Sequence, residues 1–178
     1  KVIIIIRNPY ERLVSGFIDK YQPPGFFKPK GGDFYGKLPK SYPLTFEKFT
    51  DLLLGEHRWR YIDDTHFKPQ VTFPNPLSSI QNLVSEFKVW DLKNIDYDYL
   101  NKSCSINNSS TISRGPHQRK ATKKWEGPEN ISKLPMTEYI EYNVSYSSFY
   151  TPELKSKINK FFQNDFHFAQ TQNIHYDV

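Results

Sequence analysis

A run of five consecutive aliphatic residues, Val2–Ile6, constrains the fold of this chain more than any other feature. A continuous Val/Ile run is typical of a strand buried on both faces in the middle of a parallel sheet. Asn8 and Pro9 follow, and both favour the first turn of a helix. Apolar residues then recur at helical spacing as far as Tyr21. The sequence therefore predicts a strand over 2–6 that leads directly into a helix over 9–21.

Similar patterns continue along the chain. They predict a helix over 46–54 capped by Thr45, a short helix over 78–85, a second buried strand over 87–90, a loop over 101–118, a weak helix over 129–142 and a helix from 151 to about 165. Strands that alternate with helices favour an α/β fold built on a parallel sheet. A length of 178 residues is that of one domain.

Composition excludes several classes of protein. A charged fraction of 24% is too ordinary for a disordered polyelectrolyte, and Cys104, the only cysteine, rules out a disulfide scaffold. The five histidines have no close ligand spacing, so we expect no metal site. No apolar run approaches the roughly 20 residues that a membrane span needs.

Positive charge is concentrated in one segment. Residues 99–125 contain six Lys and Arg residues and no Asp or Glu, although the net charge of the whole chain is only +5. This distribution favours a local anionic ligand over a generally cationic surface. The alternative is a solvated lysine-rich loop. Because no aromatic-interleaved basic motif accompanies the segment, we do not expect nucleic acid to be the partner.

The junction between the first strand and the first helix is the strongest candidate site. A strand that leads into a helix N-terminus places free backbone N–H groups at the carboxyl edge of the sheet, where α/β proteins bind ligands. Arg7 lies at this junction and can make a bidentate contact with phosphate, while Ser15 lies further along the helix. The alternative interpretation pairs Arg7 with Glu11 and leaves Ser15 as a packing residue.

A second glycine-rich string has the spacing of a nucleotide P-loop. It runs from Gly31 through Gly36 to Lys37, but Leu38 stands where a P-loop has Ser or Thr. No strand pattern precedes it and Pro39 follows it, so we reject a kinase-like P-loop here.

Residues 7–17, RNPYERLVSGF, resemble the 3′-phosphate motif of Golgi-type carbohydrate sulfotransferases. In that family the motif binds the 3′-phosphate of the donor 3′-phosphoadenosine 5′-phosphosulfate, and the resemblance gives that role to Arg7 and Ser15. It also implies a single domain over 1–178 with a three-layer, P-loop-like fold around a central parallel sheet, and transfer of a sulfuryl group to a glycan hydroxyl.

Two further stretches are similar to branches of the same family. Residues 65–70, THFKPQ, resemble a segment of the chondroitin and HNK-1 branch, which makes His66 a candidate catalytic residue near the acceptor. Residues 117–124, HQRKATKK, resemble the donor-covering loop of heparan sulfate 2-O-sulfotransferase. That likeness implies donor contacts for Lys120, Ala121 and Lys124, and an acceptor contact for Arg119.

The family's 5′-phosphosulfate loop has no counterpart in this sequence, which begins inside the first strand. We therefore expect that loop and an earlier strand upstream of Lys1, and we expect this chain alone to transfer sulfate poorly. The alternative is a non-catalytic fragment that binds adenosine 3′,5′-bisphosphate or an anionic glycan. The likeness also implies an anionic glycan acceptor, no metal and membrane contact only through an upstream anchor.

Localisation is indicated by the family resemblance and by short motifs. Five asparagines begin N-x-[ST] sequons, which fits a glycoprotein of a secretory lumen: Asn101, Asn107, Asn108, Asn130 and Asn143. The family resemblance implies the Golgi lumen. The lack of a cysteine pair points instead away from an oxidising compartment, with the cytoplasm as the alternative.

Overall fold

The computed structural model describes residues 1–25, 32, 44–55, 65–72, 77–104 and 121–177. The rejected P-loop-like string lies outside the described residues except for Gly32, and so does most of the predicted loop over 101–118. Arg119 and Lys120 lie outside them as well.

The described chain alternates short strands with helices. Its first half contains β1 (Val2–Ile6), α1 (Pro9–Tyr21), α2 (Phe46–Leu54), the 3₁₀ turns η2 (Thr65–Phe67) and η3 (Gln70–Thr72), α4 (Leu77–Gln81), β2 (Phe87–Asp91), η4 (Leu92–Asn94) and α5 (Tyr97–Cys104). Its second half contains β3 (Lys123–Lys124), α6 (Met136–Tyr139), β4 (Tyr142–Asn143), η5 (Tyr146–Phe149), α7 (Pro152–Phe161) and α8 (Gln163–Thr171).

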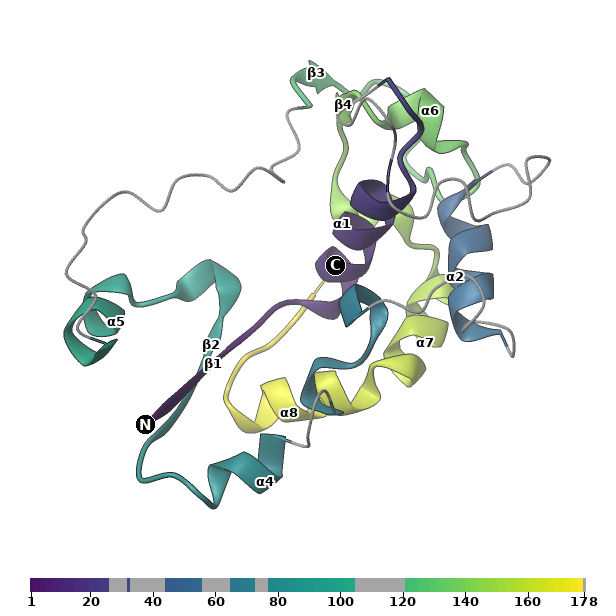
Figure 1. The fold of residues 1–178 in the computed structure, drawn as a ribbon. Coiled ribbons are helices and arrows are strands. Elements are labelled where there is room, and N and C mark those ends of the chain that lie inside the picture. Colours follow the sequence, from purple (N-terminus) through teal and green to yellow (C-terminus); the bar gives the residue numbers. More distant parts are fainter. Residues whose placement is uncertain (26–31, 33–43, 56–64, 73–76, 105–120, 178) are drawn as a thin grey trace.

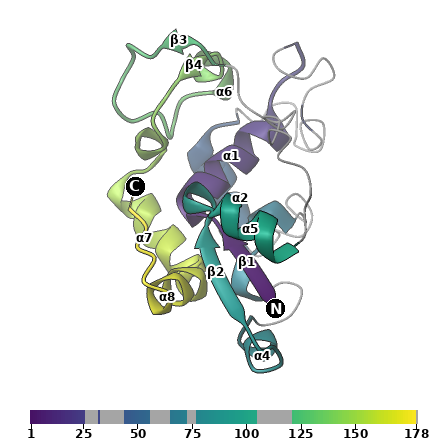
Figure 2. The ribbon, with the colours of Figure 1, turned by 90° about the vertical axis from the view of Figure 1, so that its left-hand side faces the viewer.

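Two small parallel sheets lie at opposite ends of α1 (Figures 1 and 2). β1 pairs with β2 from Val2↔Phe87 to Ile6↔Asp91, and β3 pairs with β4. The long connection from β1 to β2 contains helices, as a parallel pairing requires. The predicted α/β character is therefore confirmed as a mixture of helices with small parallel sheets.

Side-chain caps begin three of the helices at the predicted residues. The Asn8 carboxamide oxygen accepts the Tyr10 N–H at 3.0 Å. The Thr45 and Thr151 hydroxyls accept the N–H groups of Lys48 and Leu154, each at 3.2 Å. Each cap satisfies a backbone donor that the first helical turn leaves without a partner.

An aromatic core joins the N-terminal and C-terminal parts of the chain. Phe17 of α1 packs edge-on against Phe46 of α2, which in turn meets Phe149 and Tyr150 near the end of η5. All four rings are buried. Edge-to-face ring pairs add to the free energy gained from burial, so this core fixes η5 against α1.

Several sequence-based predictions of local structure were wrong. The predicted loop begins with helical residues, because α5 extends to Cys104. The predicted helix over 129–142 is reduced to α6. The last predicted helix is interrupted at Phe162, whose buried ring and non-helical backbone separate α7 from α8. This bend allows both Ile158 and Ala169 to be buried.

The two predicted core strands are only partly buried. Ile5 of β1 is 42% exposed, and every residue of β2 is half-buried. Within the described residues the sheet has two strands, so each has one edge without a neighbouring strand. Ile6, where β1 approaches α1, is the buried end of the strand.

Candidate functional site

The junction of β1 and α1 brings Arg7 and Ser15 together. The Arg7 Nη2 donates a hydrogen bond to the Ser15 Oγ at 2.6 Å. The chain turns from strand to helix at Asn8 and Pro9. The Arg7 side chain, at the end of the strand, can therefore lie alongside the first turns of α1. The predicted partnership of a strand-end arginine with a serine eight residues later is therefore present in the structure.

Tyr146 of η5 is a third polar group at this junction. Its hydroxyl lies 3.3 Å from the Ser15 Oγ, and its side chain is 37% exposed. Sequence analysis missed Tyr146 because 131 residues separate it from Ser15. Only the aromatic packing of η5 against α1 and α2 brings it there.

Two carboxylates near Arg7 form salt bridges with other residues. Glu11 pairs with Lys93, and Asp165 pairs with Arg12 at 3.2 Å. Among the described residues no carboxylate forms a salt bridge with Arg7. The alternative Arg7–Glu11 pairing is therefore not observed. A guanidinium with two hydroxyls nearby and, within the described part of the chain, no salt-bridge partner is a suitable site for an anion.

A second guanidinium, that of Arg12, lies close enough to Arg7 for the two charges to interact, and it is paired with Asp165. Burial lowers the pKa of Arg12 to about 10, and the charge of Arg7 contributes to that lowering although Asp165 opposes it. Burial likewise raises the pKa of Asp165 above its usual value, against the effect of its hydrogen bonds. Because Asp165 compensates the charge of Arg12, we assign the anion site to Arg7.

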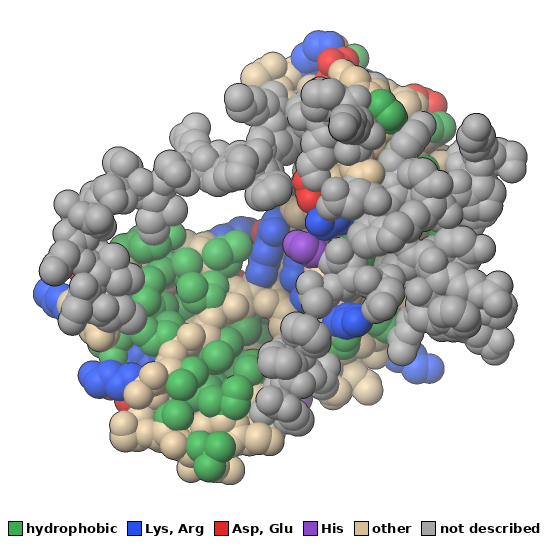
Figure 3. Space-filling model, in the orientation of Figure 1, with side chains coloured by type: hydrophobic (Ala, Val, Ile, Leu, Met, Phe, Trp, Pro, Cys, Tyr) green, Lys and Arg blue, Asp and Glu red, His purple; other side chains and the backbone are tan. Residues whose placement is uncertain are grey.

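Positively charged side chains gather near this junction on one face of the molecule. In Figure 3, Lys and Arg side chains and one histidine lie near the centre, with an acidic side chain beside them, where Figure 1 shows β1 meeting α1. Hydrophobic side chains cover the surface on the side of β2 and α5. Clustered cationic groups attract an anionic ligand.

His66 lies on η2, an element that packs against α1. Its neighbour Phe67 is buried, and a Cβ on Gly16 would come within 2.7 Å of the Phe67 ring. Since Gly16 follows Ser15 directly, η2 is close to the candidate site. His66 itself is exposed, and its catalytic role stays a prediction.

The other described residues that were predicted to contact the donor, Ala121 and Lys124, do not lie beside Arg7. Lys124 is 87% exposed on β3, and its salt-bridge partner is Glu126 at 3.9 Å. Ala121 is half-buried two residues before that strand. In both ribbon views β3 lies beyond the end of α1 that is distant from β2. The donor roles of Ala121 and Lys124 stay predictions.

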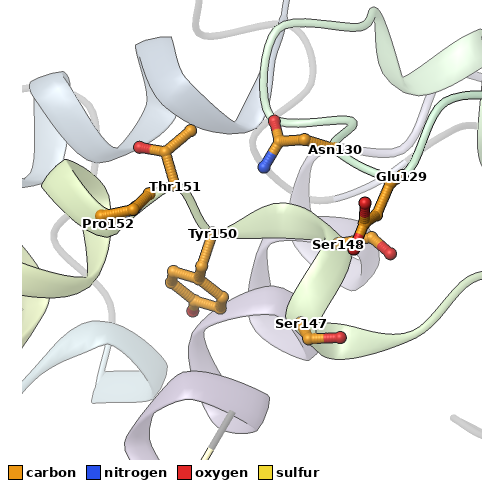
Figure 4. Close-up of a pocket in the computed structure, with 7 residues that line it drawn as sticks. All are labelled: Glu129, Asn130, Ser147, Ser148, Tyr150, Thr151 and Pro152. Carbon is orange, nitrogen blue, oxygen red and sulfur yellow. The ribbon is translucent and has the colours of Figure 1, made fainter.

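A separate pocket of about 290 Å³ lies beside η5 (Figure 4). Its lining residues are mostly polar and comprise Glu129, Asn130, Ser147, Ser148, Tyr150, Thr151 and Pro152. It contains no Lys, Arg or His, so it is not suited to phosphate. Across the described ranges, no group of three or more His, Cys, Asp or Glu residues is placed to hold a metal ion. In the same ranges no helix has the length and apolar character to span a membrane.

Comparison with known proteins identifies one family. A model described as the sulfotransferase family matches residues 1–169. No curated protein and no solved structure matches this chain.

Proposed function

We propose that this chain, which belongs to the sulfotransferase family, transfers a sulfuryl group from 3′-phosphoadenosine 5′-phosphosulfate to a hydroxyl group of a carbohydrate. Family membership supports sulfuryl transfer in general; the donor and the acceptor class are part of the proposal. We also propose that the two-stranded sheet β1–β2 belongs to the central parallel sheet of a three-layer, P-loop-like fold.

One observation carries the assignment of the donor. The Arg7 guanidinium, with no salt-bridge partner among the described residues, is hydrogen-bonded to Ser15 at 2.6 Å, and the Tyr146 hydroxyl lies beside them. These groups offer a cation and hydroxyl donors to a phosphate that lies along α1. The sequence motif assigns the 3′-phosphate of the donor to the same two residues, Arg7 and Ser15.

The proposed reaction is an in-line displacement at sulfur. The bond between sulfur and the donor phosphate oxygen breaks as a bond to the acceptor oxygen forms, and the acceptor proton passes to a general base. His66 is the catalytic candidate near the acceptor. Charge spreads over the peripheral oxygens, so orientation and cationic stabilisation dominate catalysis. Arg7 and Ser15 orient the donor, Lys120, Ala121 and Lys124 contact it, and Arg119 binds the acceptor.

Titration calorimetry with two nucleotides tests the donor site. Adenosine 3′,5′-bisphosphate and adenosine 5′-monophosphate differ only in the 3′-phosphate, so the ratio of their affinities isolates that group. Loss of a charge-assisted hydrogen bond costs about 1.5–3 kcal/mol, so Arg7→Ala lowers the bisphosphate affinity by at least about tenfold. Affinity for the monophosphate stays unchanged.

Lys157→Ala is the matched control for the calorimetry, since Lys157 is a cation of α7 that is paired with Asp51 of α2. It leaves the affinity ratio close to that of the unsubstituted chain. A folded Arg7→Ala protein with an unchanged ratio would overturn the donor assignment.

The second candidate function is binding without turnover. It is favoured by the placement of Lys124, which is expected to screen donor charge but is exposed and paired with Glu126. A fragment of this kind binds adenosine 3′,5′-bisphosphate or an anionic glycan and transfers nothing. Incubation with ³⁵S-labelled donor and a glycosaminoglycan separates the two functions: labelled glycan, even at the low rate expected of this chain alone, forms only if the chain catalyses transfer, and a fragment that only binds forms none.

We place the protein in the Golgi lumen with an anionic glycan as acceptor. Within the described residues the sequon asparagines Asn130 and Asn143 are exposed, as glycosylation requires. Expression in a secretory host, followed by glycosidase treatment and mass measurement, tests the location. A chain that enters the secretory pathway and carries no glycan on either residue would remove this support.

A further inference from the structure

Asp165 of α8 is a buried carboxylate, 4% exposed, with no role in the function proposed above. Its Oδ2 accepts hydrogen bonds from the Gln70 N–H at 3.0 Å and from the Arg12 Nη2 at 3.2 Å. Its Oδ1 accepts the Val71 N–H at 3.1 Å. One side chain near the C-terminus thus binds both α1 and η3.

These contacts hold η3 in place. A buried carboxylate is costly unless it is paired and hydrogen-bonded, and the three donors to Asp165 provide that pairing. A 3₁₀ turn of three residues has few internal hydrogen bonds and needs external partners to keep one conformation. Asp165 supplies partners for the first two N–H groups of η3.

η3 in turn holds the backbone of Arg7. The Gln70 Oε1 accepts the Arg7 N–H at 3.2 Å. Arg7 directly follows Ile6, the last residue paired between β1 and β2, so its N–H lies just beyond the sheet. The same residue donates its side chain to Ser15. Gln70 therefore contacts the backbone of the residue whose guanidinium forms the candidate anion site.

We propose that Asp165 is a positioning residue for the anion site: through η3 and Gln70 it fixes the backbone from which Arg7 reaches Ser15 and the ligand. This inference rests on the proposed function, since it gives Arg7 its phosphate-binding role. It adds a dependence of that site on α8. Small displacements of a positioned group are enough to cause large losses of binding or rate. Loss of the Asp165 contacts is therefore expected to lower the affinity of the anion site for the 3′-phosphate.

Gln70→Met tests the link between η3 and Arg7. Methionine has nearly the length of glutamine but offers no strong acceptor to the Arg7 N–H, and Gln70 is only half-buried, so the fold is retained. The ratio of bisphosphate to monophosphate affinity, measured by calorimetry, falls about five-fold, which is the loss of one hydrogen bond. The exchange rate of the Arg7 backbone amide, measured by NMR, rises.

Asp165→Asn tests the origin of the link. It keeps the size of the side chain but removes its charge and one acceptor, and we expect the same two changes as in Gln70→Met. Because both residues act through η3, the double variant loses less than the product of the two single losses. Asp51→Asn is the matched control, since Asp51 is a carboxylate that joins α2 to α7 through Lys157.

The possible outcomes are distinct. Lower thermal stability with an unchanged affinity ratio and unchanged Arg7 amide exchange in both variants would show that Asp165 is merely structural and would overturn the inference. If the unsubstituted chain does not distinguish the two nucleotides, the proposed function fails. The amide exchange then decides alone whether Asp165 positions Arg7: faster exchange in Asp165→Asn supports it, and unchanged exchange refutes it.

Discussion

Ser15 lies between the Arg7 guanidinium and the Tyr146 phenol. The number of hydroxyl hydrogens that remain free there determines what the site can donate to a ligand. Arg7 only donates, so the Ser15 Oγ accepts from it. The Ser15 and Tyr146 hydroxyls share one hydrogen between them at 3.3 Å. Whichever of the two donates, the other hydroxyl hydrogen remains available to a ligand. The site therefore offers a phosphate both a charge and a neutral donor.

Tyr146→Phe removes one of these hydroxyls and keeps the ring. We expect the affinity for adenosine 3′,5′-bisphosphate to fall about two- to tenfold, the effect of one neutral hydrogen bond, with no loss of thermal stability. Calorimetry measures the affinity. Tyr97→Phe is the control, since Tyr97 is 47% exposed on α5. Equal affinities for the two variants would remove Tyr146 from the site.

Gly16 is required by the close approach of α1 to η2. A Cβ at this position would lie 2.7 Å from the ring of Phe67, which is 1% exposed. Gly16→Ala therefore lowers the free energy of unfolding by about 1–3 kcal/mol, the usual cost of overpacking a core, despite the better helix propensity of alanine. Urea denaturation measures this change. Ser156→Ala at an exposed position of α7 serves as control, and a Gly16→Ala chain that matches its stability would contradict the packing.

At the scale of elements, the β1–β2 sheet is held at its outer end by one carboxylate. Glu86 precedes β2 and binds Lys1, which precedes β1, at 2.8 Å, and it also accepts a hydrogen bond from Tyr99 of α5. The hydrogen bond from Lys1 is the main reason that the pKa of Glu86 is lowered to about 2. A lowered carboxyl pKa means that the folded state favours the charged form.

The pH dependence of stability follows from that direction. The contribution of Glu86 is complete above pH 4.5, its ordinary pKa, and is lost as the pH falls toward about 2. Urea titrations between these values therefore show a steeper loss of stability for the unsubstituted chain than for Glu86→Gln. The difference is small because Glu86 is near the surface. Parallel curves for the two chains would show that the pairing contributes nothing.

How much of each element could be predicted depended on how local its signals were. The α1 helix is set by Asn8, Pro9 and its own apolar spacing, and the structure matches its predicted bounds. The interruption at Phe162 accompanies the burial of its own ring and of Ile158 and Ala169 on the two helices that it separates. No local pattern encodes this tertiary burial, so the sequence predicted a continuous helix.

The same distinction applies to the candidate site as a whole. Arg7 and Ser15 are eight residues apart in one motif, so sequence alone could pair them. Tyr146, Gln70 and Asp165 come from three distant elements and meet the junction only in the folded chain. Polar side chains whose partners are more than 60 residues away leave no short-range signal in a single sequence.

At the scale of the whole molecule, the account depends on where the anion binds. A crystal structure of the chain with adenosine 3′,5′-bisphosphate tests this most directly. We predict the 3′-phosphate within hydrogen-bond distance of the Arg7 guanidinium and the Ser15 hydroxyl, beside the first two turns of α1. A nucleotide bound elsewhere, such as at Lys123 and Lys124 of β3, with Arg7 still bonded only to Ser15, would contradict the account.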